Sequence, residues 1–368
     1  MYQHQLMQKV KFTNRDTLGF YSTVRSRVDD YFKTNNISKF ANGAMYLKTV
    51  IILGGVVGTY ALIISNILTP LGMLGAAIVL GVFKALTGFN VCHDAIHGSY
   101  SDNKMVNHLL SYTFYILGAN VYIWSITHNQ VHHTYTNIPG HDEDIEVAPG
   151  IIRLSPLDKI NKMQKYQHIY GFLVYGLASL FWVFRKDYKK FFQKKIGDSW
   201  DNTKHPAIEY FNLFFFKLLY YFLFIGVPLY LLPISFGQFL IGFLMMHLAQ
   251  GLVLGLVFQL AHVVEGTAFP EVDVNGNIDE VWAIHQMYTT ADFSRKSPIA
   301  AFICGGLNMQ IEHHLFPKIC HIHYPQLSAI VQSTAEEFNI PYIENKTFIQ
   351  ALGSHYRMLK KFGYDEFK

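Results

Sequence analysis

Four long apolar stretches constrain this chain more than any other feature of its sequence. They cover residues 46–68, 71–92, 211–232 and 236–260, and each is long enough to cross a bilayer, which takes about 20 helical residues. Only TP separates the first two and only PIS the last two, so we predict two tight helical hairpins. With 51% of the residues hydrophobic and 15% charged, the composition also suits a lipid-facing protein.

Basic residues indicate which side of the membrane each segment faces. The two hairpin connections contain no Lys or Arg, whereas the N-terminal arm, the long middle segment and the C-terminal third hold nearly all of them. By the positive-inside rule those three segments face the cytoplasm. The net charge of +4 is too small to indicate a nucleic-acid partner.

Two further segments are less clearly membrane-spanning. Residues 105–126 are only moderately apolar, and the apolar run 169–184 is short and is followed by the basic stretch RKDYKKFFQKK. These flanking charges favour a helix lying in the membrane interface. A single crossing by 169–184 would place the last histidine cluster on the opposite side from the first two.

The predicted fold is therefore an all-α membrane protein with four transmembrane helices in two hairpins, interfacial helices and a cytoplasmic helical cap. We treat 1–368 as one domain. Its predicted parts are a cytoplasmic arm (1–45), the first hairpin (46–92), a cytoplasmic or interfacial segment (93–210), the second hairpin (211–260) and the cap (261–368).

Many of the 18 histidines lie in clusters at the ends of these spans. In HDAIH the two histidines are four residues apart, a spacing that puts both rings on one face of a helix. HNQVHH repeats that spacing, QIEHH places its histidines three and four residues after a Gln, and a lone His follows the last span. All four emerge on the same predicted side, which indicates a metal site. The predicted ligands are His93, His97, His128, His132, His133, His262, His313 and His314.

The number of histidines narrows the kind of metal site. Imidazole suits zinc, copper, iron and nickel, but eight clustered histidines exceed the three or four that one zinc takes. They fit two metal ions, each with an open position. Two irons beside a hydrocarbon-lined bundle would suit oxygen activation, whereas zinc would suit hydrolysis, and the residues alone leave this choice open.

Polar residues beside the clusters are candidates for supporting roles. Asp94 and Glu312 could accept the second ring N–H of a neighbouring ligand, or could be ordinary surface acids. Asn308 could hold a metal-bound water, and His285 could be a ligand or a hydrogen-bond donor to one. Gln310 is expected to face the site without being an ordinary ligand.

The acidic run that follows the second cluster has a plainer interpretation. Asp142, Glu143 and Asp144 are expected to form a solvated acidic loop. Alternatively, they could orient a polar headgroup or an electron donor.

The motifs HDAIH, HNQVHH with HHTYTN, GHDEDIE and GGLNMQIEHHLFP together resemble the three histidine boxes of the membrane fatty acid desaturases. The resemblance covers nearly the whole chain and is closest to the acyl-lipid and front-end branch, including bacterial acyl-CoA or linoleoyl-CoA desaturases. It implies a diiron centre, held by the eight histidines, that uses O2 and two electrons to remove two hydrogens from an acyl chain. It also implies a bacterial cytoplasmic membrane as the location, with the active site on the cytoplasmic face.

The sequence departs from relatives of this family in two ways. The animal stearoyl-CoA enzymes place four residues between the histidines of the first box, where this chain has three, and they begin the third box with His, where this chain has Gln310. A Gln there is typical of front-end desaturases. Many of those carry a cytochrome b5 domain with an HPGG motif, which is absent here, so we expect electrons from a separate donor of the ferredoxin or cytochrome b5 type.

The expected activity is thus that of an oxidoreductase that desaturates a CoA- or lipid-linked acyl chain within membrane lipid. Hydroxylation of an acyl chain or alkane by the same kind of centre is the nearest alternative. A zinc-dependent membrane hydrolase, such as a lipid amidase, is the alternative from another class.

Overall fold

The computed structural model describes residues 10–13, 16, 18–145, 148–156, 158–197 and 200–364. Part of the predicted N-terminal arm (1–45) therefore lies outside the described residues. The described chain is predominantly helical, with only two-residue strands. Strand β1 (Lys11–Phe12) pairs in parallel with β4 (Asn277–Ile278), β2 (Lys195–Ile196) pairs antiparallel with β3 (Trp200–Asp201), and β5 (Asp292–Phe293) pairs in parallel with β6 (Glu344–Asn345).

Among the described residues, five helical segments are long and apolar enough to cross a membrane, and a sixth candidate is the pair Lys104–Leu117 and Val121–Tyr135, which is bent by 103°. Four of the five cover the four predicted spans. The fifth covers the run that the sequence placed in the interface. The five segments are Gly43–Ile64 (α2), Pro70–His97 (α3, Pro70–Thr87; η1, Gly88–Cys92; α4, His93–His97), Gln164–Phe192 (η4, Gln164–Tyr166; α8, Gln167–Phe181; η5, Trp182–Lys186; α9, Asp187–Phe192), Ala207–Leu231 (α10, Ala207–Tyr221; η6, Phe222–Gly226; α11, Val227–Leu231) and Phe236–His262 (α12).

Local sequence signals set the turns of the predicted hairpins. Thr69 accepts a hydrogen bond from the Gly72 amide at the start of α3, where Pro70 occupies the first turn. Ser235 and Gln238 form a reciprocal capping box at the start of α12. These side chains satisfy amide groups that a helix start leaves unpaired, so the short connections TP and PIS end one helix and begin the next.

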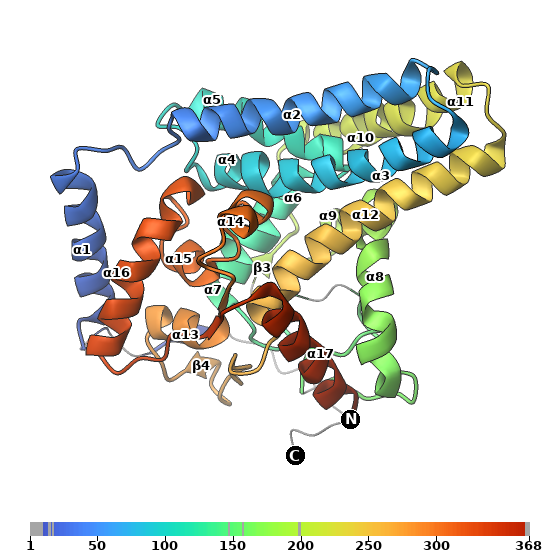
Figure 1. Ribbon diagram of the computed structural model, residues 1–368. Coiled ribbons are helices and arrows are strands. Elements are labelled where there is room, and N and C mark those ends of the chain that lie inside the picture. The colour runs from blue at the N-terminus through green and yellow to red at the C-terminus, as the bar shows by residue number, and fades with distance from the viewer. Residues whose placement is uncertain are drawn as a thin grey trace.

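Small residues let the long helices pack closely. Figure 1 shows α2, α3 and α10 running along one side of the molecule, with α12 crossing beneath them and α8 standing against α12. A Cβ added at Gly81 of α3 would meet the Met246 carbonyl oxygen of α12, and one at Gly251 of α12 would meet the Gly176 carbonyl oxygen of α8. Close backbone approach through small residues is typical of helices packed in membranes.

A chain of buried hydrogen bonds joins four of these helices. The Lys84 ammonium of α3 donates to the Tyr220 hydroxyl of α10 at 2.8 Å, and that hydroxyl lies 3.0 Å from Nε2 of His247 in α12. Nδ1 of His247 lies 2.9 Å from the Ser179 hydroxyl of α8. All four side chains are buried, so each polar group depends on its neighbour in this chain.

The other described elements are α1 (Phe20–Thr34), α5 (Lys104–Ser111), η2 (Tyr112–Leu117), α6 (Val121–Trp124), η3 (Ser125–His132), α7 (His133–Tyr135), α13 (Trp282–Thr289), α14 (Pro298–Cys304), α15 (Gln310–Leu315), η7 (His321–His323), α16 (Tyr324–Glu337) and α17 (Phe348–Tyr364). Of these, α1, α13, α15 and α16 lie together at one end of the long helices (Figure 1), and we call these four helices the cap. They share one apolar core, which includes Phe20, Val28, Met287, Ile311 and Leu327.

The close contact between α8 and α12 gives a first test. Gly251→Ala should lower the melting temperature of the purified protein by several degrees, because overpacking against backbone costs about 1–3 kcal/mol. Gly242→Ala, on the same helix, is the matched control because an added Cβ there meets nothing within 4 Å. Equal melting temperatures for the two variants would contradict the packing described here.

Candidate metal centre

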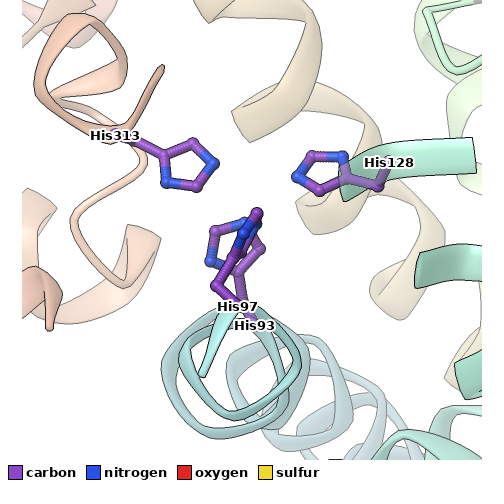
Figure 2. Close-up of side chains that lie close together, drawn as sticks. All are labelled: His93, His97, His128 and His313. Carbon is purple, nitrogen blue, oxygen red and sulfur yellow. The ribbon is translucent and has the colours of Figure 1, made fainter. Parts of the chain in front are cut away.

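The first box begins where a π-helical turn ends. Segment η1 (Gly88–Cys92) is π-helical and leads directly into α4, whose His93 and His97 rings have centroids 4.7 Å apart. Figure 2 shows both rings projecting from one helix toward the rings of His128 and His313, which approach from two other segments. Ring nitrogens of these four histidines all lie within 4.8 Å of one another.

The second box is itself π-helical, over Ser125–His132. The rings of His128 and His132 stack with centroids 5.1 Å apart. His133 begins the α-helical turn that follows, and its Nε2 atom lies 3.3 Å from that of His128. His132 instead contributes to a second group with His262 and His314, again within 4.8 Å. His93 and His97 of the first box therefore belong to one group, whereas His128 and His132 of the second box belong to two different groups.

Gln310 lies at the second group. Its amide nitrogen donates to Nε2 of His262 at 2.9 Å and faces Nε2 of His314 at 3.3 Å, while its amide oxygen is buried without a hydrogen-bond partner among the described residues. The third box thus places Gln310 against the same nitrogens that a metal in this group would use. A third overlapping group consists of His133, His313 and His314, so the two main groups are adjacent.

Two carboxylates accept hydrogen bonds from histidines of the second box. They contact the Nδ1 atoms, which are the outward-facing nitrogens of these rings. Nδ1 of His132 lies 2.8 Å from Oδ2 of Asp142, and Nδ1 of His128 lies 3.0 Å from Oδ2 of Asp144. Such a bond fixes the tautomer with the proton on Nδ1 and leaves Nε2 as a lone pair. Asp142 is 2% exposed and Asp144 9%, so the prediction of a solvated acidic loop is wrong for these two residues.

Burial and charge set the protonation states around these histidines. Although burial opposes ionisation, the neighbouring His132 and its hydrogen bond hold the pKa of Asp142 below its usual range. The pair is reciprocal: although burial opposes it, the charge and hydrogen bond of Asp142 raise the pKa of His132. Burial and the surrounding imidazoles hold the pKa values of His313 and His314 well below the ordinary histidine value, so these two rings are neutral, as metal ligation requires.

Three further outward-facing nitrogens meet neutral acceptors, whereas Nδ1 of His133 is buried without a hydrogen-bond partner among the described residues. Nδ1 of His314 lies 2.7 Å from the Gln286 amide oxygen, Nδ1 of His313 lies 3.3 Å from the Tyr324 hydroxyl, and Nδ1 of His262 lies 3.3 Å from a backbone carbonyl oxygen. Sequence reasoning missed Gln286 and Tyr324. The first follows His285 in the run WAIHQ, where attention to polar neighbours of the histidine could have found it.

Several inward-facing nitrogens have no such partners. Among the described residues, the Nε2 atoms of four predicted ligands are buried without a hydrogen bond, and an unpaired buried polar group costs about 1–3 kcal/mol. Their lone pairs, collected in two adjacent groups, therefore fit two metal cations. The four are His93, His97, His132 and His313.

The other residues predicted near the site have different contacts. Asp94 is hydrogen-bonded to Nδ1 of His321 at 2.8 Å and Glu312 to the Tyr342 hydroxyl at 2.9 Å, so the structure does not place either carboxylate on the neighbouring histidine ring.

Asn308 and His285 also lie outside the three histidine groups. The amide of Asn308 donates to the Phe293 carbonyl at 3.2 Å. The His285 ring packs edge-on against Phe12, with centroids 5.1 Å apart, and burial lowers the pKa of His285 to about 4.

An apolar cavity of about 110 Å³ reaches the first group, where His93, His128 and Gln310 form its polar end. Ser179, the last member of the hydrogen-bond chain, also lines it. Asp144 and Lys186 also belong to the lining, which is otherwise predominantly apolar. Its large apolar lining residues are Phe89, Phe114, Trp124, Phe181, Trp182, Leu254, Phe258 and Leu307.

Comparisons with known proteins agree with this geometry. A protein of Synechocystis sp. named sn-1 linoleoyl-lipid 6-desaturase is 37% identical over 358 residues, covering 97% of this chain and 98% of that protein. Its namesake from Arthrospira platensis is 37% identical, covering 95% and 94%. The acyl-lipid (8-3)-desaturase of Physcomitrium patens is also 37% identical, covering 98% of this chain and 75% of that protein. The fatty acid desaturase family profile matches residues 68–346, and the chain therefore belongs to the fatty acid desaturase family.

Proposed function

We propose that this protein introduces a cis double bond into a lipid-linked acyl chain, using O2, two electrons and two iron ions. The observation that carries the proposal is the pair of adjacent histidine groups with unpaired nitrogens, one of which lies at the polar end of an apolar cavity. The relatives named as linoleoyl-lipid and acyl-lipid desaturases support a lipid rather than CoA as the acyl carrier.

In this proposal the eight histidines named above hold the two irons. When bound, the irons supply the reduction of O2 and the removal of hydrogen from an unactivated C–H bond. The overall reaction converts –CH2–CH2–, O2, two electrons and two protons into –CH=CH– and two molecules of water.

The residues of this chain position the metals and the substrate. Asp142 and Asp144 fix the tautomers of His132 and His128 through short hydrogen bonds. The aromatic walls of the cavity exclude water and hold the acyl chain in one orientation, so that cavity shape selects the reacting carbons. A separate ferredoxin or cytochrome b5 type protein is the proposed electron donor.

The closeness of the three histidine boxes also supports a specific membrane topology. Between the second and third boxes lie three candidate spans, Gln164–Phe192, Ala207–Leu231 and Phe236–His262. Three crossings would place those boxes on opposite sides of the membrane, whereas two crossings place them together. We therefore propose four spans in two hairpins, with Gln164–Phe192 in the interface and the metal centre in a cytoplasmic cap of a single domain. The charge distribution supports the cytoplasmic face of the membrane, and the relatives from Synechocystis and Arthrospira support a bacterial membrane.

Product analysis tests the proposed reaction. Expression in a host supplied with linoleate should yield a new polyunsaturated fatty acid in the lipid fraction, located by mass spectrometry of a double-bond derivative. His132→Ala should abolish the product because it removes a proposed ligand from the second group. An acyl product that carries an added oxygen atom would overturn the proposal in favour of hydroxylation.

Metal analysis tests the centre itself. The purified protein should contain about two irons per chain, and Asp142→Asn should lower iron affinity about 10- to 100-fold because the outer hydrogen bond to His132 weakens. Asp102→Asn, which changes an exposed acid outside the described site, is the matched control and should retain iron. One zinc and no iron would favour the hydrolase alternative.

Substitution of Gln310 tests whether a metal in the second group has an open coordination position. Gln310→His adds an imidazole beside His262 and His314, so we expect slower loss of iron to a chelator and a lower turnover rate, because catalytic metal sites need a free position. The two rates are measured on the same preparation. Unchanged chelator resistance together with full activity would mean that Gln310 only lines the site.

A further inference from the structure

A second hollow lies on the molecule where the first span meets the cap. It has a volume of about 880 Å³ and lies between the first turns of α2, the start of α14, and α16, which are close together in Figure 1. None of its lining residues lines the apolar cavity at the histidines. We call it the basic groove and define it by Leu47, Lys48, Ile51, Arg295, Lys296, Ser297 and Phe302.

The charge of the basic groove is one-sided. Its lining contains Lys48, Arg295 and Lys296, and no carboxylate is among the described residues that line it. Arg295 is paired with Glu344 at 3.1 Å. No ion pair between described residues includes Lys48 or Lys296, so the groove keeps two cations for an anion from outside the chain.

Lys48 is held in place at the base of this groove. The Lys48 side chain is buried. Its ammonium nitrogen lies 3.0 Å from Nε2 of His321 and 5.0 Å from the centroid of the Phe302 ring. These neighbours orient the ammonium, and the carboxylate of Asp94 lies behind His321, to which it is hydrogen-bonded, without forming an ion pair with Lys48. Because a desolvated cation is costly without an anionic partner in direct contact, the position of Lys48 favours binding of an anion.

Apolar side chains lie beside these cations. Leu47 and Ile51 are 61% and 48% exposed and are four residues apart on α2, a candidate span, so they share one face of the helix. The groove thus combines a basic end at the membrane boundary with an apolar strip that continues along a span. This combination matches the phosphate and the acyl chain of a membrane lipid.

We propose that the basic groove binds an anionic glycerophospholipid of the surrounding membrane, with its phosphate at Lys48 and Lys296 and an acyl chain along Leu47 and Ile51. This lipid is distinct from the substrate, so the proposal does not rest on the proposed reaction. The bound phosphate also joins a hydrogen-bonded path, because His321 continues from Lys48 to Asp94 of α4 at 2.8 Å. The lipid therefore stabilises the contact between the first span and the helix that carries His93 and His97.

The binding test compares two lipids in detergent by native mass spectrometry. Wild-type protein should retain phosphatidylglycerol more strongly than phosphatidylcholine. Lys296→Gln, which changes an exposed side chain, should weaken phosphatidylglycerol binding about fivefold, because one basic residue near the lipid headgroup contributes about that factor. Lys48→Met should weaken it at least as much, and neither variant should change the binding of phosphatidylcholine.

Lys104→Gln is the matched control, because Lys104 is an exposed lysine that does not line the groove. It should leave phosphatidylglycerol binding unchanged. Equal retention of the two lipids by wild-type protein would overturn the proposal, and so would an equal loss for Lys104→Gln and Lys296→Gln, which would indicate general attraction of anionic lipid to basic residues.

Discussion

A buried imidazole offers a lone pair to a metal when its other nitrogen carries the proton, and a hydrogen-bond acceptor at that nitrogen fixes this tautomer. The structure provides such acceptors for five histidines from three distant segments. The acceptors are the carboxylates of Asp142 and Asp144, the amide of Gln286, the hydroxyl of Tyr324 and a backbone carbonyl. They come from loops and helices outside the boxes, so the cap has to fold around the histidines before the inward-facing nitrogens are correctly prepared.

The π-helical segments solve a related geometric problem. Two metal ions need ligands directed to two places, and the second box supplies them from one short segment. The rings of His128 and His132 stack on one face of the π-helical segment Ser125–His132, with centroids 5.1 Å apart, yet His128 lies in the first group and His132 lies with His262 and His314. π-helical segments are rare and are frequently found at functional sites. Here one of them is the means by which a single short segment serves both groups.

Much of this arrangement could be predicted from residue patterns, and the remainder could not for physical reasons. The spans and the histidine boxes follow from length, hydrophobicity and spacing, which are local properties. The spacing rule held for both pairs, because the ring centroids of His93 and His97 lie 4.7 Å apart and those of His128 and His132 lie 5.1 Å apart. Which group each ring joins depends on tertiary packing. The burial of Asp142 and Asp144 depends on the rest of the chain folding over them. In the sequence by itself, a run of three consecutive acidic residues indicates a solvated loop. The helix over 164–192 passes a test of length and composition, yet length alone cannot distinguish a crossing from an interfacial position.

The hydrogen-bond chain from Lys84 through Tyr220 and His247 to Ser179 has a consequence for the cooperativity of the bundle. Each member belongs to a different helix, and hydrocarbon offers no replacement partner for any of them. Withdrawal of one helix would therefore expose an unpaired polar group on at least one other. The four helices are coupled in a way that apolar contacts between lipid-facing helices cannot provide, since lipid tails replace such contacts at little cost. Because Ser179 also lines the cavity at the histidines, this all-or-none coupling extends to the wall against which an acyl chain would lie.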